Sequence, residues 1–376
     1  MHKILLITSS GGGGLLLSAT AKEQEIKQQD PLAKIIRKDL LLDWMGPVIG
    51  GFGRWYYNWA QKNGRVFWQN LLVRCNLYAD KLFFPFIFYR TLKVLLEEEI
   101  DEVIDNQPVG TSAIIKAVRC YNYWKKKHLK LEKILVDLPT RHYRFLLKSL
   151  KNLSKKDKTY LRLVTIEPLL ETDQSEADFW KKYAGLKLEQ IVYEKYVIRT
   201  PFKKLMGKRR EHKTCPIKIR VSSEPEKNFF ERFLACNSSP VQRLFDGYEF
   251  LINPEDRLIV LLLGSQPARN ATYQYVEKIM QLVQSRSEHY YLFVFADRFK
   301  HQKNNLFARL FLLCANKPKN LSLVPMSFQE DETIANLFHR SDLTLTRSGG
   351  HTIMELMAVA KREKWIHSEA KKSESL

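Results

Sequence analysis

Apolar residues along this chain gather in short runs, and longer stretches that mix apolar and charged residues separate these runs. The clearest run, 258–263, is apolar at every position, which is typical of a parallel strand buried on both faces. Strands that alternate with helical stretches form parallel sheets, and the alternation recurs in both halves of the chain. The pattern therefore predicts an α/β fold.

At three places the pattern predicts a strand, a loop of small residues and a helix in direct succession. The three units span 3–27, 258–283 and 343–360, and their loops cover 9–14, 264–270 and 348–350. Glycine lets a ligand approach the backbone, and the N–H groups of a first helical turn attract an anion together with the helix dipole. Loops at the carboxyl ends of two parallel strands can face one crevice. The two later units together predict a phosphate or diphosphate site.

The composition narrows the class of protein. The chain has 376 residues, enough for two domains, and its 45% hydrophobic and 12% aromatic content is that of a globular protein. Its net charge of +20 makes nucleic acid and anionic membranes candidate partners. No nucleic-acid module is recognised, which argues against nucleic acid. Basic residues beside aromatic ones at 55–57, 83–90 and 121–127 suit the headgroup zone of a bilayer, although core aromatics with solvated lysines give the same pattern.

Cysteine usage and the amino terminus bear on the compartment. The five cysteines have no paired spacing, which predicts reduced thiols, a cytosolic setting and no metal site. No apolar run has the length needed to span a membrane. The first 21 residues imitate a secretory signal, but the glycines at 11–14 interrupt its apolar core, so a strand, glycine loop and helix is the preferred prediction. The expected location is cytoplasmic, with a membrane surface as a candidate partner.

Four side chains carry candidate chemistry. Arg347 ends a strand, where its guanidinium could pair with a phosphate, and Glu355 lies about one turn into the next helix, where it could bind a ribose diol. Asp137 follows an apolar strand and His142 comes shortly after, so they are the best candidates for a catalytic base, which needs a tunable pKa. Simpler alternatives stay open: an incidental arginine in an ordinary βα unit, and an Asp137 that caps a turn beside a surface histidine.

These motifs resemble a known family. Gly-Ser-Gln at 264–266, Ala-Arg-Asn at 268–270, Arg-Ser-Gly at 347–349 and Glu355 are similar to the donor half of GT-B glycosyltransferases, in particular the MurG and monogalactosyldiacylglycerol synthase group of family 28. In that family the first loop contacts the diphosphate of a nucleotide sugar, the glutamate binds the ribose, and a loop here matched by 326–328 lies against the base. The resemblance implies donor-binding roles for Gly264, Ser265, Gln266, Arg269, Met326, Phe328, Arg347, Ser348, Gly349, Gly350, His351 and Glu355.

The resemblance extends to the first half. The turn Gly12, Gly13 and Gly14 is similar to the family's acceptor-side loop, but Leu15 stands where the family has a histidine, so the acceptor or the base chemistry is expected to differ. The aromatic segment 44–90 matches the region that touches the membrane and the lipid acceptor in galactolipid synthases. After residue 360 the family continues with a strand, a donor loop and a last helix, whereas 361–376 is largely polar, so a shortened second domain is expected.

The resemblance implies two Rossmann-like parallel-sheet domains that face a cleft. An acceptor-side domain is expected over 1–200, a charge-rich linker over 201–214 and a nucleotide-sugar domain over 215–376. The implied reaction transfers a sugar from a UDP- or GDP-sugar by direct displacement, with no metal and no cofactor besides the substrate. A non-catalytic nucleotide-sugar-binding protein, a nucleotide-sugar hydrolase and a basic nucleic-acid or membrane adaptor remain alternatives. The sequence leaves open the sugar, the base and whether the acceptor is a lipid, a glycan or a protein.

Overall fold

The computed structural model describes residues 1–11, 13–140, 144–210, 213–221, 223–237, 240–297, 299 and 305–368. The chain forms two compact units, and each has its own sheet. Of the described residues, the first contains 1–60 and 65–199, and the second contains 61–64 and 200–368.

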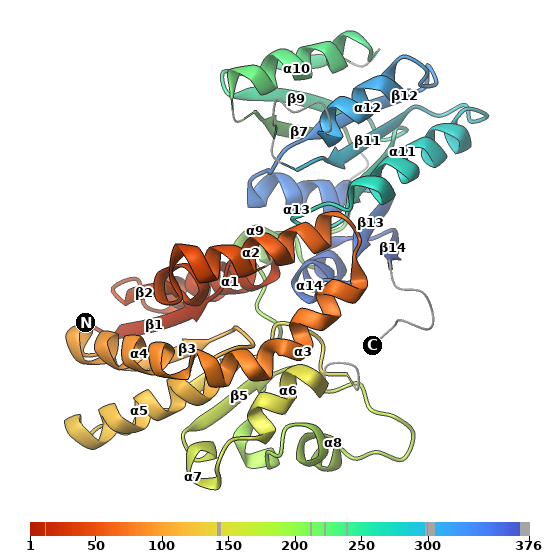
Figure 1. Cartoon of the computed structure of the whole chain (residues 1–376). Helices are drawn as coiled ribbons and strands as arrows, with labels where there is room; N and C mark the ends of the chain where they lie inside the picture. The colour runs from red at the N-terminus through yellow and green to blue at the C-terminus, as the bar shows by residue number, and fades with distance from the viewer. Residues whose placement is uncertain are drawn as a thin grey trace. The chain divides into compact units, whose positions relative to one another are not determined.

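The first unit is built on a six-stranded parallel sheet with the strand order β2-β1-β3-β4-β5-β6. Figure 1 labels β1, β2, β3 and β5 of this sheet. Its strands are β1 Lys3–Thr8, β2 Lys34–Asp39, β3 Glu102–Asp105, β4 Leu131–Ile134, β5 Leu161–Thr165 and β6 Ile191–Tyr193. Its helices are α1 Gly13–Gln29, α2 Gly46–Lys62, α3 Val66–Leu82, α4 Phe84–Glu98, α5 Thr111–Lys125, α6 Arg144–Lys151, α7 Lys155–Lys158 and α8 Glu176–Tyr183. The strand predicted at the amino terminus is confirmed, because β1 runs through the core with five consecutive buried residues.

The alternation of basic and apolar residues over 33–42 predicts a second strand, and this prediction is wrong at its end. β2 stops at Asp39, and a short π-helix, Leu40–Trp44, follows. The Asp39 carboxylate accepts hydrogen bonds from the backbone N–H groups of Leu41 and Leu42. A side chain that caps the next turn in this way offers the backbone an alternative to the sheet, and the strand ends.

The second unit contains a five-stranded parallel sheet with the order β12-β11-β10-β13-β14. Its strands are β10 Arg257–Leu262, β11 Tyr290–Phe295, β12 Leu321–Met326, β13 Leu343–Arg347 and β14 Glu363–His367. Its helices are α9 Thr200–Leu205, α10 Glu224–Ala235, α11 Arg269–Val283, α12 Leu306–Cys314, α13 Asp331–Arg340 and α14 Gly350–Val359. The predicted class is confirmed: both halves are Rossmann-like α/β units with parallel sheets, the pair of units that makes up a GT-B chain.

Three features of the second unit differ from the predictions. Residues 215–252 form an antiparallel sheet, β7-β9-β8, although only parallel sheets were predicted; its strands are β7 Cys215–Arg220, β8 Val241–Arg243 and β9 Gly247–Ile252. β8 and β9 are joined by only three residues, which is enough for an antiparallel pair but not for a parallel crossover. The predicted linker begins with helix α9, whose Phe202 packs against Phe338 of α13.

The third difference lies after α14, where a polar stretch was expected. Residues 363–367 instead form β14, which pairs in parallel with β13 from Leu343↔Glu363 to Arg347↔His367. β14 is an edge strand, and backbone hydrogen bonds to β13 hold it although several of its side chains are exposed. Such a strand gives little hydrophobic signal in the sequence, since only one of its edges is paired and its faces stay partly in water.

Candidate functional site

The two loops that sequence analysis selected in the second half leave the sheet side by side. β10 and β13 are neighbouring parallel strands, and Leu262 at the end of β10 lies opposite Thr346 near the end of β13. The loop 263–268 follows β10 and leads into α11, while the loop 348–349 follows β13 and leads into α14. Because parallel strands end at the same edge of a sheet, both helices begin at that edge. The predicted pairing of these loops is therefore present.

Arg347 links the two loops. Its Nη1 donates a hydrogen bond to the carbonyl oxygen of Gln266, 3.2 Å away. Its Nη2 donates to the carbonyl oxygen of Gln61 at 2.8 Å, in the short segment 61–64 that belongs to this unit. The half-buried guanidinium thus lies at the end of β13 with its terminal nitrogens held by backbone carbonyls. This arrangement fixes a positive charge beside the loop that leads into α11.

Gly264 fits this close approach for a physical reason. Its φ is +87°, a backbone conformation that other residues adopt only with strain. A Cβ atom built at Gly264 would lie 3.5 Å from Cδ of Arg347 and 3.8 Å from its Nη1. A side chain here would therefore strain the backbone and pack directly against the arginine.

The N-cap residues of both helices are small and apolar. Ala268 precedes α11 and Gly349 precedes α14, and neither offers a side-chain acceptor to the first turn. Neither first turn contains an acidic residue. Ser348 and Gly349 are exposed, and Ser265 and Gln266 are half-buried. The positive ends of two helix dipoles and Arg347 together produce a local preference for an anion.

Glu355 and His351, both predicted to contact the donor, are buried within α14. They lie one turn apart, and Oε1 of Glu355 is 3.0 Å from Nε2 of His351. The exposed fractions of the two residues are 1% for Glu355 and 0% for His351. In this conformation the carboxylate is directed to the imidazole instead of the surface, so a ribose can reach it only if the pair opens. The ribose-binding role of Glu355 stays a prediction.

The predicted base pocket is divided between core and surface. Met326 ends β12 and is 1% exposed, so its side chain belongs to the core, while Phe328 is exposed. β12 is separated from β10 by β11, which puts its carboxyl end about 10 Å from that of β10 at ordinary strand spacing. Of the two residues, only Phe328 presents its side chain to solvent at that edge.

The residues predicted for the acceptor side belong to the first unit. Gly13 and Gly14 are the first residues of α1, so the helix that follows β1 is confirmed but begins inside the loop predicted over 9–14. Asp137 is half-buried and follows the end of β4 by three residues, so it lies on a loop at the carboxyl end of a strand, as predicted. Gly12 and His142 lie outside the described residues. The catalytic role of Asp137 stays a prediction.

Sequence analysis missed a buried polar cluster at the carboxyl ends of β3 and β4. Nζ of Lys133 lies 2.6 Å from Oδ2 of Asp105, and both side chains are buried. Nearby, Oδ1 of Asp80 accepts a hydrogen bond of 2.6 Å from the backbone N–H of Gly110 at the start of α5. Burial raises the pKa of Asp80 to about 6, against the opposing effects of that hydrogen bond and of Lys133. Lys133, directly before the apolar residues 134–136, was the available signal.

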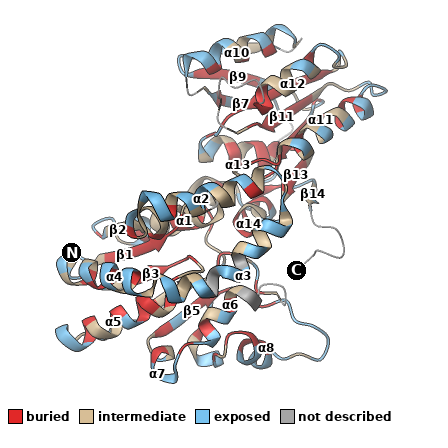
Figure 2. Cartoon of the chain, in the orientation of Figure 1, coloured by how far each residue is buried: buried red, intermediate tan, exposed pale blue. Residues whose placement is uncertain are grey.

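Helices α2, α3 and α4 carry many exposed apolar residues. Figure 2 colours exposed residues pale blue, and such stretches recur along these three helices. We call these apolar residues the aromatic face; it consists of Val48, Ile49, Phe52, Trp55, Trp59, Phe67, Trp68, Leu71, Tyr78, Leu82, Phe86 and Tyr89. Residues 46–96 contain seven Lys or Arg residues and one acidic residue, Asp80. In the part of the chain that the structure describes, no helix is both long and apolar enough to cross a bilayer.

No protein-family model matches this chain, and no curated protein does so either. Its solved structural neighbours include MurG from Acinetobacter baumannii, with 12% identity, a TM-score of 0.47, and coverage of 100% of this chain and 80% of MurG. UDP-GlcNAc 2-epimerase from Neisseria meningitidis, solved with UDP-GlcNAc, shares 9% identity over 93% of this chain and 78% of its own, with a TM-score of 0.42. A glycosyltransferase from Rickettsia africae shares 12% identity over 96% and 78%, with a TM-score of 0.40. At this level the similarity concerns the backbone fold.

Proposed function

We propose that the second unit binds a nucleotide sugar through its diphosphate and that the chain is a glycosyltransferase. The observation that carries this proposal is that the loops after β10 and β13 lie at one edge of the sheet, with Arg347 at the end of β13 hydrogen-bonded to Gln266 in the other loop. Two helix amino ends and a fixed arginine suit a diphosphate, which needs donors and positive charge on more than one side. The Gly-Ser-Gln and Arg-Ser-Gly motifs at these positions agree with the family resemblance.

The chemistry proposed for this site is direct displacement at the sugar carbon. Negative charge grows on the diphosphate as the bond to the sugar breaks, and fixed dipoles and cations at that place stabilise the transition state more than the ground state. Arg347 and the first-turn amides of α11 and α14 would do this without a metal ion. In the described ranges no three His, Cys, Asp or Glu side chains lie close enough together to hold one. Asp137 is the proposed base that removes the acceptor's proton.

We further propose that the first unit docks on an anionic membrane surface through the aromatic face. The exposed fractions of Trp55 and Phe86 are 58% and 62%. Both side chains would leave water for an apolar environment in the interfacial zone of a bilayer. Arg54, Arg74 and Arg90 are exposed on the same helices and would pair with lipid phosphates. A lipid acceptor is consistent with such docking.

A non-catalytic nucleotide-sugar-binding protein is the second candidate. Two observations favour it: Leu15 replaces the histidine that the family has in its first loop, and Glu355 is closed in a buried pair with His351. Both proteins would bind the donor, so turnover separates them. Mass spectrometry after incubation with UDP- and GDP-sugars detects transfer or hydrolysis, and binding without either product would support this second candidate.

Donor binding itself is tested by calorimetry with UDP- and GDP-sugars on wild type and on Arg347→Gln. Loss of one charge-assisted contact costs about 1.5–3 kcal/mol, so the variant should bind roughly 10- to 150-fold more weakly. Arg232→Gln is the matched control, because Arg232 is exposed on α10 of the same unit and its substitution removes the same charge. If no nucleotide sugar binds wild type, or if both variants bind alike, the proposal is wrong.

A further inference from the structure

A second basic site lies at the opposite end of the same sheet. A pocket of about 650 Å³ is lined by three segments that precede strands or helices of the second unit, with the residues Gly207, Lys208, Arg209, Arg210, Pro254, Glu255, Arg257, Lys361 and Arg362. Arg257 begins β10, whereas the donor loop follows Leu262 at the other end of that strand. Five steps along a strand cover about 17 Å, so this pocket is separate from the proposed donor site.

The pocket has a strong excess of positive charge. Six of its nine lining residues are Lys or Arg and one, Glu255, is acidic, which gives a formal charge of +5. Lys208, Arg209, Lys361 and Arg362 are exposed. Like charges this close repel one another, and the repulsion is relieved when an anion enters. The arrangement therefore favours a ligand that carries several negative charges.

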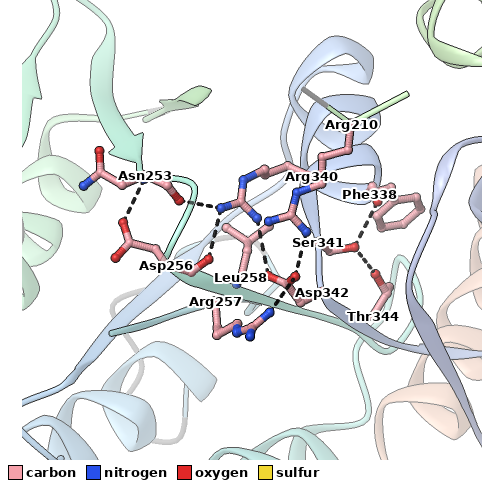
Figure 3. A network of polar contacts seen from close by, with 10 residues as sticks. All are labelled: Arg210, Asn253, Asp256, Arg257, Leu258, Phe338, Arg340, Ser341, Asp342 and Thr344. Atoms are coloured by element: carbon pink, nitrogen blue, oxygen red, sulfur yellow. Dashed lines mark hydrogen bonds and ion pairs between the residues drawn. The ribbon is translucent and has the colours of Figure 1, made fainter. Parts of the chain in front are cut away.

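A hydrogen-bonded network fixes the floor of this pocket. Figure 3 shows Arg210, Arg257 and Arg340 around the single carboxylate of Asp342, at 2.6, 3.7 and 3.3 Å. The backbone N–H of Leu258 donates to the same carboxylate at 2.9 Å. One aspartate thus orients three guanidinium groups and neutralises only one of them. If the network served the fold alone, a single arginine would be enough to pair the aspartate.

Arg340 ties this network to the turn that begins the pocket. Its Nη2 donates to the carbonyl oxygens of Asn253 at 2.7 Å and Asp256 at 3.0 Å, and Arg340 itself is buried. Burial and the neighbouring charge of Arg210 lower the pKa of the Arg340 guanidinium below its ordinary value. On the opposite wall, the backbone carbonyl of Lys208 lies 3.2 Å from Nε2 of His339. The walls are therefore held in place before any ligand arrives.

The lining also limits the kind of ligand. Small-molecule pockets usually measure about 300–1,000 Å³, so this volume exceeds what one inorganic phosphate needs. No lining residue is aromatic, and Pro254 is the only apolar side chain, so the lining offers no aromatic face to a base or a sugar ring. Arginine forks match phosphate oxygens in pairs. We propose that this pocket binds a small ligand through a di- or triphosphate group, distinct from the nucleotide-sugar site.

The test is calorimetry with pyrophosphate and with tripolyphosphate on the full chain at 150 mM salt, in the Arg347→Gln background, which weakens phosphate binding at the donor loops. We expect saturable binding near one ligand per chain. The double variant Arg209→Gln/Arg362→Gln should bind at least tenfold more weakly, and it should fold, because both side chains are exposed and lie outside the Asp342 network. The control Arg232→Gln/Arg286→Gln removes the same charge from exposed positions elsewhere in the unit and should bind like wild type.

Two further arms separate the sources of the phosphate. Arg347→Gln alters only the donor loops, so unchanged pyrophosphate binding in this variant supports a separate pocket whether or not nucleotide sugars bind. Vesicles with phosphatidic acid present a lipid phosphate, and binding to them that requires Arg209 and Arg362 would identify a headgroup as the source. The proposal is overturned if pyrophosphate shows no saturable binding, or if the pocket and control variants bind it equally. It is also overturned if phosphatidylserine vesicles and RNA bind as strongly as phosphatidic acid vesicles, because charge alone would then explain the binding.

Discussion

Asp80 provides a test of the structure that depends on pH. It lies near the end of α3, and its carboxylate accepts the backbone N–H of Gly110, which has a φ of +85° and precedes α5. This contact joins α3 to the start of α5. Burial of the carboxylate outweighs that hydrogen bond and raises its pKa from 3.8 to about 6. The folded state therefore prefers the protonated acid.

The sign and size of the effect of pH on stability follow from the linkage between protonation and folding. A carboxyl group whose pKa is raised on folding stabilises the fold when it is protonated, so its contribution is complete below about pH 4 and is lost as the pH rises through about 6. Each unit of pKa difference corresponds to about 1.36 kcal/mol. The difference of roughly two units amounts to about 3 kcal/mol as an upper bound at pH 8.

We therefore expect Asp80→Asn to stabilise the first unit at neutral pH. Asparagine keeps an oxygen that can accept the Gly110 N–H but carries no charge. At pH 8 the variant should gain up to about 3 kcal/mol in the free energy of unfolding, and at pH 4 it should be close to wild type. Denaturant unfolding followed by tryptophan fluorescence measures this, because six of the seven tryptophans belong to the first unit, and Trp365→Phe removes the seventh.

Asp101→Asn is the matched control in the same unit. Asp101 is exposed, and its hydrogen bond with Lys127 lowers its pKa, so this variant should lose a little stability at neutral pH instead of gaining it. A gain for Asp80→Asn that is the same at pH 4 and pH 8 would refute the reasoning. The reasoning would also be refuted if the wild-type first unit became more stable as the pH rises through the titration of Asp80.

Three other predictions follow from the second unit and the aromatic face. Glu355→Ala should lower the free energy of unfolding because it leaves His351 buried without this partner. If Glu355 also binds ribose, the same variant should weaken donor binding by about 1.5–3 kcal/mol in calorimetry, whereas His351→Ala should affect stability alone. Equal donor binding by wild type and both variants would contradict the ribose role. Burial of Asp342 is outweighed by its arginine and backbone hydrogen bonds, which lower its pKa. In thermal scans wild type should therefore lose stability as the pH falls below about 4. Asp342→Asn should be less stable than wild type at pH 7 and should lack that loss. Phe52→Ser/Trp55→Ser should reduce cosedimentation with anionic vesicles severalfold without a change in thermal stability, and unchanged sedimentation would contradict membrane docking by this face.

The parts of the site that sequence could predict are those with local causes. An apolar run followed by small residues and a helix specifies a βα turn, and two such runs in parallel strands end at one edge, so the meeting of the loops after β10 and β13 was predictable. The glycine at 264 was also informative, because a positive φ has few other occupants. β14 was not predictable in the same way, since its side chains carry no buried pattern and its place depends on pairing with β13.

The sequence encodes local features, whereas the directions of buried side chains depend on how the whole unit packs. By itself the sequence determined two α/β halves, the positions of their glycine loops and an excess of positive charge, since these follow from short-range propensity and composition. Only the tertiary structure decided that Glu355 turns inward to His351 and that Arg210, Arg257 and Arg340 converge on Asp342. These partners come from different elements or depend on which helix face is buried, and a buried charge takes whichever partner the folded chain brings within hydrogen-bonding distance.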